Sequence, residues 1–344
     1  MYKITACIII RKNTYSLYFV INSQERRYMK TRNKLLTLLI LSAGAATATA
    51  LINKAIKISA TSKNVLSDTE SLCYKWRLGN IHYTKAGTGK PLLLVHDLTP
   101  SSSGYEWTAI AGRLAETYTV YTIDLLGCGR SEKPNLTYTN YLYVQLISDF
   151  IKSEIGHRTD VIATGASAAL AVMACGNSPE LFDRLMFINP DSLLACSQVS
   201  GRHAKLYKFM LDLPIAGTLL YHIATSRKSL TEELKATGFY NPYMVRTSML
   251  DAYHEAAHLG ESPKSVYASV RCHYTKCNIV NALKKIDNSI YLLGGDGEEL
   301  IQERFDEYKE MNPIIEYSLI AKTKHLPQLE KPGEVLKAIQ TYFS

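Results

Sequence analysis

Cysteine is scarce in this chain, and its spacing excludes the sites that paired cysteines build. The 344 residues include seven cysteines without a C-x-x-C pair, so we expect no metal site of that type. The odd count also excludes a framework that pairs every thiol within one chain. We expect mostly buried, small apolar thiol side chains, with one disulfide between Cys272 and Cys277 as an alternative in an exported body.

Nucleotide-cofactor motifs are absent as well. The sequence has neither a G-x-G-x-x-G pattern after its first strand-like segment nor a phosphate loop with lysine, so we expect no cofactor. Repeats and low-complexity segments are also missing.

Because 47% of the residues are hydrophobic, the chain can bury one large core or two smaller ones. The composition predicts an enzyme-sized globular body.

Acidic residues are nearly absent from the first 60 positions. That stretch has ten Lys or Arg residues against one acid, Glu25, and the whole chain has a net charge of +8. The remaining residues are therefore close to neutral. This placement argues against a nucleic-acid partner and favours membrane targeting, because positive charge beside an apolar segment sets its orientation.

Only one run is long and apolar enough to span a membrane, which excludes a transporter component. It covers about residues 35–52, where a helix would measure about 27 Å against the roughly 30 Å of a bilayer core. We interpret residues 1–60 as a basic region with an uncleaved membrane anchor. A cleaved secretory signal and a buried helix are the alternatives, and Met29 is a second candidate start. Anchor and signal both place the body outside the cytoplasm.

From about residue 79, strand-like and helix-like segments alternate. The strand-like segments are short and apolar, at residues 80–87, 91–96, 119–124, 160–165, 185–190, 289–295 and 315–321. Periodic segments typical of helices lie at about 105–117, 138–155, 167–177, 299–311 and 332–343. The alternation predicts an α/β fold in which helices cover both faces of a mostly parallel sheet, after an early antiparallel strand.

One long stretch interrupts this alternation. Residues 192–286 are almost entirely helical in pattern and contain no clear strand. We therefore predict a core formed by residues 61–191 and 287–344, with a helical cap at 192–286. Segments inserted at the carboxyl end of such a sheet carry function, so this cap is expected to lie over the site and select the substrate.

Polar residues follow several of the predicted strands. His96 ends the strand at 91–96, Ser167 lies in the turn after the strand at 160–165, and His325 follows the last strand. Open α/β sheets bind ligands at the carboxyl ends of their strands. We therefore expect these side chains to meet at one edge of the sheet.

These motifs, in this order, resemble the α/β-hydrolase family over about residues 75–344. "LLLVHD" is similar to the family's strand ending in His-Gly, and "DLLGCGRSEKP" to its Asp-x-x-Gly-x-Gly-x-Ser loop. "HLPQLEKP" looks like its catalytic-histidine segment. The resemblance implies a serine hydrolase with a helical cap, whose triad has the order serine, acid, histidine.

Within this resemblance, Ser167 is the expected nucleophile, although Ala169 stands where G-x-S-x-G has its last glycine. A serine hydroxyl needs a base within hydrogen-bond reach, and His325 is the histidine at the matching strand end. The carboxylate that orients this base is expected to be Glu298. Asp296 and Asp191 are the alternatives.

The oxyanion hole is expected to use two backbone N–H groups, those of Ala168 and Leu98. Asp97 departs from the family's pattern, because it replaces the glycine that usually follows the histidine. A carboxylate there would repel a developing oxyanion or an anionic substrate unless its side chain turns away to cap the next segment.

The leading hypothesis is a carboxylesterase-like enzyme that works through an acyl-enzyme and takes a small acyl or ester substrate. The alternative is a membrane-tethered ligand-binding or signalling protein on the same fold, with slow or no turnover. Ala169, Asp97 and the ambiguous acid motivate this alternative. The fold hosts unrelated activities, so the substrate class rests on analogy.

Overall fold

A computed structural model describes residues 30–31, 34, 36–67 and 71–343 of the chain. The predictions that involve Cys7 and a start at Met29 lie outside these residues. The chain divides into two units, Met1–Lys54 and Ala55–Ser344, and each is described by itself.

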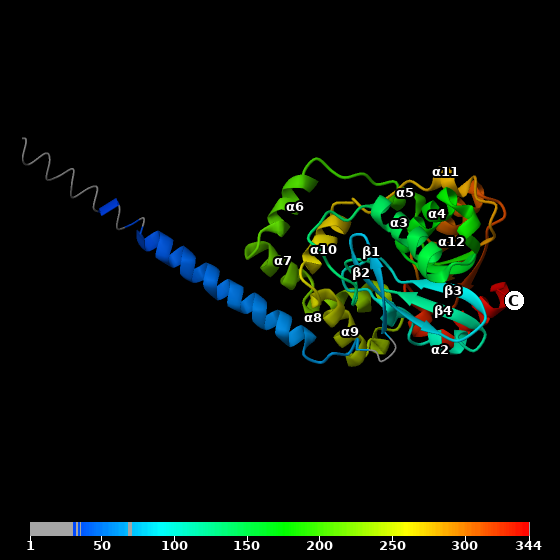
Figure 1. Cartoon of the computed structure of the whole chain (residues 1–344), viewed down its shortest axis with the longest axis horizontal. Coiled ribbons are helices and arrows are strands. Elements are labelled where there is room, and N and C mark those ends of the chain that lie inside the picture. Colours follow the sequence, from blue (N-terminus) through cyan, green and yellow to red (C-terminus); the bar gives the residue numbers. More distant parts are fainter. Residues whose placement is uncertain (1–29, 32–33, 35, 68–70, 344) are drawn as a thin grey trace, which may run out of the picture. The chain divides into compact units, whose positions relative to one another are not determined.

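A single helix, Leu36–Thr61, begins in the first unit and ends in the second (Figure 1). It has 26 residues and a mean hydropathy of 1.7, so its length of about 39 Å exceeds the roughly 30 Å of a bilayer core. Leu38, Ile40 and Leu51 are among its exposed side chains. By length and composition the helix is compatible with a membrane anchor or a signal sequence.

The second unit is built on an eight-stranded sheet with the order β1-β2-β4-β3-β5-β6-β7-β8. Every neighbouring pair from β4 across to β8 is parallel, whereas β2 pairs antiparallel with both β1 and β4. The strands are β1 Ser71–Trp76, β2 Gly79–Ala86, β3 Lys90–Val95, β4 Tyr118–Ile123, β5 Thr159–Thr164, β6 Phe182–Ile188, β7 Ile290–Gly295 and β8 Glu316–Ile320. The predicted α/β class is confirmed.

The edge strand β1 was not predicted from the sequence. It forms a hairpin with β2, in which Trp76 is opposite Gly79 across a two-residue turn. Most of its side chains are exposed or half-buried, so it lacks the apolar run that marks the inner strands. Its pairing with β2, rather than burial, defines it as a strand.

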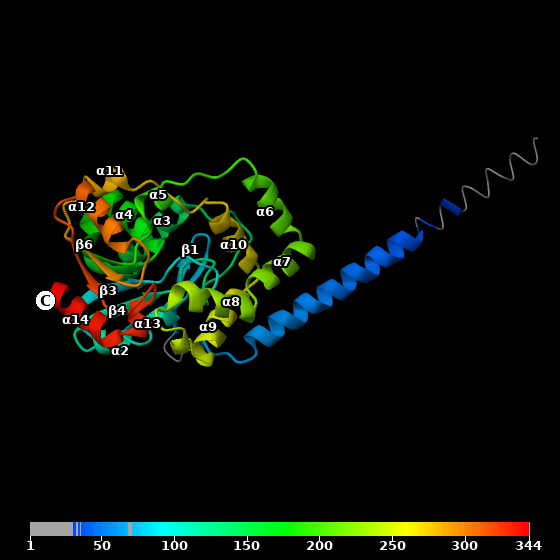
Figure 2. The same cartoon turned by 180° about the vertical axis from the view of Figure 1, so that it is seen from behind.

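Helices cover both faces of the sheet, as Figures 1 and 2 show. One face packs against α3 Asn140–Phe150, α4 Ser167–Asn177 and α12 Ile301–Met311, through buried side chains such as Phe150 and Phe305. The other face packs against α2 Ala111–Leu114 and α14 Pro332–Phe343. The helix expected at 105–117 is shorter than predicted, because a 3-10 turn at Gly104–Trp107 precedes α2.

The chain between β6 and β7 is helical, and the described residues there contain no strand. We call residues 192–286 the inserted segment. Its helices are α5 Leu193–Cys196, α6 Ala204–Asp212, α7 Ala216–Ala224, α8 Arg227–Glu233, α9 Thr247–His258, α10 Pro263–Arg271 and α11 Val280–Leu283. The helices from α6 to α10 gather on one side of the sheet in both views, whereas α5 and α11 lie beside α4 and α12 (Figures 1 and 2). Shorter helical turns of the chain are Ile151–Ile155, Pro179–Leu181, Leu234–Gly238, Pro242–Met244 and α13 Pro327–Glu330.

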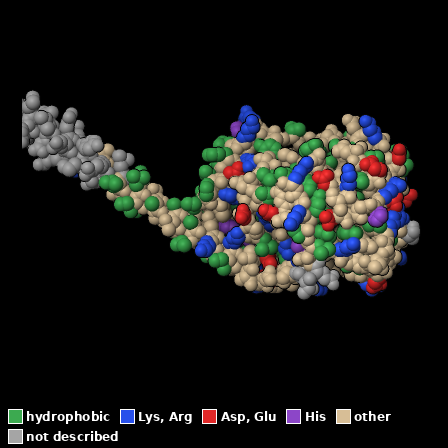
Figure 3. Space-filling view, viewed as in Figure 1, with side chains coloured by type: hydrophobic (Ala, Val, Ile, Leu, Met, Phe, Trp, Pro, Cys, Tyr) green, Lys and Arg blue, Asp and Glu red, His purple; other side chains and the backbone are tan. Residues whose placement is uncertain are grey.

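The cysteines of the described residues are all free, so the alternative disulfide between Cys272 and Cys277 does not form. Four of the thiols are buried, as expected, while Cys73 is exposed. The described residues contain no group of three metal-ligating side chains. On the face seen in Figure 3, basic and acidic side chains are interspersed over the second unit.

Candidate active site

The sheet brings the loop after β3 beside the turn after β5. Val95 pairs with Ala163 in the parallel register, so the two chains leave the sheet together, and Asp97 comes to lie against Gly165. Hydrogen bonds extend this contact beyond the strands, because the Ala166 N–H donates to Asp97 Oδ1 over 2.8 Å. The ends of two neighbouring strands, β3 and β5, therefore bring the first residues of the site together.

Gly165 makes the sharp turn that leads from β5 into α4. Its φ of 54° lies in the left-handed region, where glycine has no steric penalty. A Cβ on Gly165 would lie only 2.4 Å from Asp97 Oδ1 and 2.5 Å from Asp97 Cγ. The Asp97 carboxylate therefore fills the space that a side chain at position 165 would occupy.

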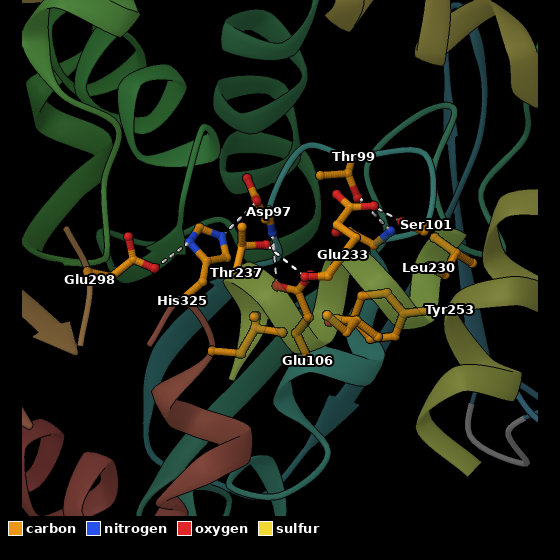
Figure 4. A pocket seen from close by; sticks show the side chains of 14 residues that line it. Asp97, Thr99, Ser101, Glu106, Leu230, Glu233, Thr237, Tyr253, Glu298 and His325 are labelled. Atoms are coloured by element: carbon orange, nitrogen blue, oxygen red, sulfur yellow. Dashed lines mark hydrogen bonds and ion pairs between the residues drawn. The ribbon is translucent and has the colours of Figure 1, made fainter. Parts of the chain in front are cut away.

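The two oxygens of Asp97 have different partners. Oδ1 accepts hydrogen bonds from the backbone N–H groups of Leu98, at 2.7 Å, and Ala166, at 2.8 Å. Oδ2 lies 3.0 Å from Nε2 of His325 (Figure 4). One oxygen is thus held by backbone donors while the other faces the histidine.

The backbone of Asp97 is fixed by buried neighbours. Its N–H donates to Glu106 Oε2 over 3.0 Å. Its carbonyl accepts from Nδ1 of His96 at 2.6 Å, because Nε2 of that ring already accepts from the Leu125 N–H. These contacts hold the aspartate in place without using its carboxylate.

His325 lies between two carboxylates, as Figure 4 shows. It follows β8 and directs Nε2 to Asp97, while Nδ1 is 3.9 Å from Oε1 of Glu298. Glu298 follows β7, and its other oxygen is 3.9 Å from Arg304. The two nitrogens of the ring therefore face one acid each, from opposite sides.

The other two acids proposed as partners of His325 are bound elsewhere. Asp296 accepts a hydrogen bond from the Lys322 N–H at 2.6 Å, within the turns that follow β7 and β8. Asp191 forms an ion pair with Lys276. Of the three candidates, Glu298 is the one beside His325.

Ser167 is fully buried and does not meet His325 in this structure. Its hydroxyl donates to the carbonyl of His96 over 2.6 Å, and the residue begins α4. The Ala168 N–H donates to the carbonyl of Gly165 at 3.2 Å. The N–H groups that converge on one oxygen, Asp97 Oδ1, are those of Leu98 and Ala166. An oxyanion hole formed by Leu98 and Ala168 stays a prediction.

Asp97 and His325 form an ion pair. Burial lowers the pKa of His325, but the hydrogen bond and the charge of Asp97 outweigh it and raise that pKa to about 9. Burial raises the pKa of Asp97, but the hydrogen bond and charge of His325 lower it by more. The pKa of Asp97 is therefore below its ordinary value. At neutral pH the resting site contains a charged aspartate and a charged histidine.

A cavity of about 260 Å³ opens beside this pair. Core loops provide Asp97, Glu106, Glu298 and His325, and the inserted segment provides Leu230, Glu233, Leu234, Thr237, Gly238 and Tyr253. Burial and the charge of Asp97 raise the pKa of Glu106 to about 7, and burial raises that of Glu233. The Tyr253 hydroxyl is buried and has no hydrogen-bond partner among the described residues.

Sequence reasoning missed Gly165 and Ala166 as site residues and treated Asp97 only as a disturbance. The small residues around the turn allow two alignments, with either Ser167 or Gly165 at its tip. The positive φ of Gly165 distinguishes them. The replacement of a glycine by Asp97 was the signal in the sequence that pointed to an altered site.

The sequence profile of the Alpha/beta hydrolase family matches residues 92–338. An uncharacterized protein of Mycobacterium tuberculosis is 29% identical over 121 residues, which make up 35% of each chain. A soluble epoxide hydrolase of Corynebacterium sp. is 31% identical over 110 residues, 32% of this chain and 37% of that protein. The similarity thus spans about a third of the length of these relatives.

Solved structures share the fold over most of their length. The epoxide hydrolase CorEH superposes with a TM-score of 0.63 at 20% identity, covering 79% of this chain and 98% of that one. The carboxylesterase CesB of Bacillus subtilis gives a TM-score of 0.63 at 16% identity, covering 86% and 98%.

Proposed function

Because the chain belongs to the alpha/beta hydrolase family, we propose that it hydrolyses a small molecule in the cavity beside Asp97, His325 and Glu298. The observation that carries this proposal is the position of His325, whose two nitrogens face two carboxylates at the cavity. An imidazole that lies between two carboxylates can move protons during hydrolysis.

The nature of the bond that is cleaved depends on the attacking group. An acyl-enzyme at Ser167 stays a prediction, and it requires the hydroxyl to exchange its bond with the His96 carbonyl for one with His325. No described interaction joins Ser167 to His325, whereas Asp97 already faces Nε2. The geometry therefore favours Asp97 over Ser167 as the group that works with the histidine.

The charge of the cavity limits its substrates. Four carboxyl side chains line it, Asp97, Glu106, Glu233 and Glu298, against one basic side chain, His325, among the described lining residues. An anionic substrate would meet repulsion there, since like charges in a partly buried site interact strongly. We propose a neutral or cationic small molecule as the substrate.

The N-terminal helix bears on where this chemistry takes place. We propose that Leu36–Thr61 anchors the chain in a membrane with the hydrolase body outside the cytoplasm, because the basic residues precede the apolar run. A secreted form after signal cleavage is the alternative. The mass of the chain recovered from the expressing cell, measured on the intact protein, distinguishes the two.

Variants of the full-length chain in mild detergent test the proposed activity. The panel of probes contains 4-nitrophenyl acetate, styrene oxide and 1,2-dibromoethane. We expect hydrolysis of at least one probe, lowered at least 100-fold in Asp97→Asn and in His325→Gln. Asp306→Asn, which alters an exposed pair with Tyr317, is the control and should leave the rate unchanged.

A second candidate, a ligand-binding protein without turnover, is favoured by one observation. The Asp97 carboxylate already accepts from two N–H groups that would otherwise be open to a substrate oxygen. In that case no probe is hydrolysed by the folded protein. Thermal stabilisation by a ligand would then persist in His325→Gln.

A further inference from the structure

The residue at the tip of the turn after β5 has no side chain. Gly165 occupies the left-handed tip of the turn, and a Cβ there would point into the Asp97 carboxylate. We infer that Asp97 is the nucleophile of this site, acting from the loop after β3 in place of the side chain that Gly165 lacks. It attacks a saturated carbon that bears an oxygen or halogen leaving group.

The contacts of Asp97 give its two oxygens different roles. Oδ1 is held by the N–H groups of Leu98 and Ala166, so it is the oxygen at which negative charge is stabilised. Oδ2 has no backbone donor among the described residues and lies 3.0 Å from Nε2 of His325 at the cavity. Oδ2 is therefore the attacking atom.

The same contacts argue against an acyl substrate. The carbonyl oxygen of an ester would need the two N–H groups that Oδ1 already occupies. A carboxylate that attacked an ester would also form an anhydride, and it is a better leaving group than the alkoxide it would have to expel. Attack at a saturated carbon forms an ordinary ester instead, which water can hydrolyse.

In the first step, a lone pair of Oδ2 forms a bond to the saturated carbon. The bond from that carbon to the leaving atom breaks, and its electrons depart with the leaving atom. A departing oxygen takes the Nε2 proton of His325, whereas a halide leaves as the anion and the proton passes to solvent. Asp97 becomes a neutral alkyl ester, and His325 becomes a neutral imidazole.

Loss of the aspartate charge lowers the pKa of His325 before the second step. The raised pKa of His325 depends on the charge and hydrogen bond of Asp97, so in the ester burial lowers that pKa. Neutral His325 can then remove a proton from water, with Glu298 beside Nδ1. The same residue thus holds its proton before the attack and gives it up afterwards.

Water completes the turnover. Its oxygen adds to Cγ, and the negative charge develops on Oδ1 between Leu98 and Ala166. The Cγ–Oδ2 bond breaks, the alcohol leaves with a proton from His325, and the new carboxylic acid returns a proton to that ring. The product carries the original Oδ2, and Asp97 keeps one oxygen from water.

This inference rests on the proposed hydrolase function, and isotope transfer separates the two. Full-length protein in excess over styrene oxide or 1,2-dibromoethane is allowed one turnover in oxygen-18 water, and the peptide that contains Asp97 is weighed. We expect one heavy oxygen in Asp97 and none in the newly formed hydroxyl of the product. Asp306→Asn should give the same result.

Each other outcome contradicts one of the two statements. Hydrolysis that places the heavy oxygen in the product, with none in Asp97, overturns the inference and leaves the proposed function standing. Hydrolysis of 4-nitrophenyl acetate alone overturns it as well, because the reacting carbon is then an acyl carbon. A folded protein that hydrolyses none of the three probes contradicts the proposed function itself.

A second measurement traps the intermediate. The probe is 1,2-dibromoethane, because its bromide leaves without a proton from His325. His325→Gln lacks the base for the second step, so the ester on Asp97 should accumulate and appear as an added mass on the same peptide. Asp97→Asn, incubated identically, should gain no mass there. An adduct on another residue, or none in a His325→Gln variant that still consumes the probe, would overturn the assignment of Asp97.

Discussion

At the residue scale, the site depends on a carboxylate that occupies an unusual place. Asp97 fills the space above Gly165, binds two backbone donors and forms an ion pair with His325. Each of these contacts has a measurable consequence.

The titration of His325 should depend on Asp97. Its pKa is about 9 because the hydrogen bond and charge of Asp97 outweigh burial, so the stabilisation of the fold by this pair is complete below pH 6.5 and is lost as the pH rises through about 9. In Asp97→Asn we expect the pKa of His325 to fall by about one unit or more. Histidine NMR measures the shift, with Asp306→Asn as control. An unchanged pKa would contradict the ion pair.

Tyr253→Phe should make the protein more stable and less active. The hydroxyl is buried without a partner among the described residues, and such a group costs about 1–3 kcal/mol. Its removal should raise the free energy of unfolding. Tyr253 also lines the cavity, and a hydroxyl without a partner among the described residues can donate to a bound substrate, so we expect kcat/KM to fall about tenfold. Denaturant unfolding and steady-state kinetics check both effects, and a loss of stability would mean that the hydroxyl has a partner.

At the element scale, the turn between β5 and α4 determines how the site is arranged. Its tip is a glycine with a φ of 54°, and the register of β3 against β5 places Asp97 beside it. A side chain at position 165 and the Asp97 carboxylate therefore exclude one another. This makes the turn sensitive to a single methyl group.

Gly165→Ala should destabilise the fold and abolish the activity. The left-handed backbone costs a non-glycine residue about 1 kcal/mol, and the added Cβ would displace the Asp97 carboxylate from its donors. We expect at least a 100-fold loss of hydrolysis. Gly112→Ala is the matched control, since a Cβ there meets nothing within 4 Å and helices favour alanine. Equal behaviour of the two variants in unfolding and kinetic assays would refute this view of the turn.

The elements differ in how far the sequence could predict them. The strands from β2 to β8 follow from their apolar runs, and the long helical insertion follows from its period. β1 did not, because its burial is slight and its pairing partner is not visible in a local pattern. Likewise, His325 was predicted from its strand end and Glu298 from the family resemblance. The role proposed for Asp97 was not predicted, because it depends on a contact with Gly165 between two strands.

At the scale of the whole molecule, the inserted segment both lines the cavity and contains buried histidines. His222 and His258 stack with ring centroids 4.9 Å apart, and burial lowers the pKa of each to about 4. The neutral form is therefore favoured in the folded state. Because protonation of these buried rings is unfavourable in the folded state, acid should destabilise the fold.

The free energy of unfolding should fall between pH 6.5 and about 4. The folded pKa of His258 is lowered from 6.5, so its contribution is complete above that value and is lost as the pH falls toward about 4. The loss amounts to at most about 3 kcal/mol, since one pKa unit corresponds to about 1.4 kcal/mol. His258→Asn keeps a donor in place of Nδ1 and should flatten the pH profile, while the exposed His157→Asn should not. Parallel profiles for both variants in denaturant unfolding would contradict this origin.

The most direct test of the site is to ask which residue reacts as a nucleophile toward an acyl-type probe. Full-length protein is treated with a fluorophosphonate and the modified residue is found by mass spectrometry, alongside the double variant Asp97→Gly with Gly165→Ser. We predict no modification of Ser167 in the natural chain and modification at position 165 in the double variant, where a serine at the turn faces His325. Modification of Ser167 in the natural chain that disappears in His325→Gln would contradict the assignment of Asp97 and establish the serine as the nucleophile.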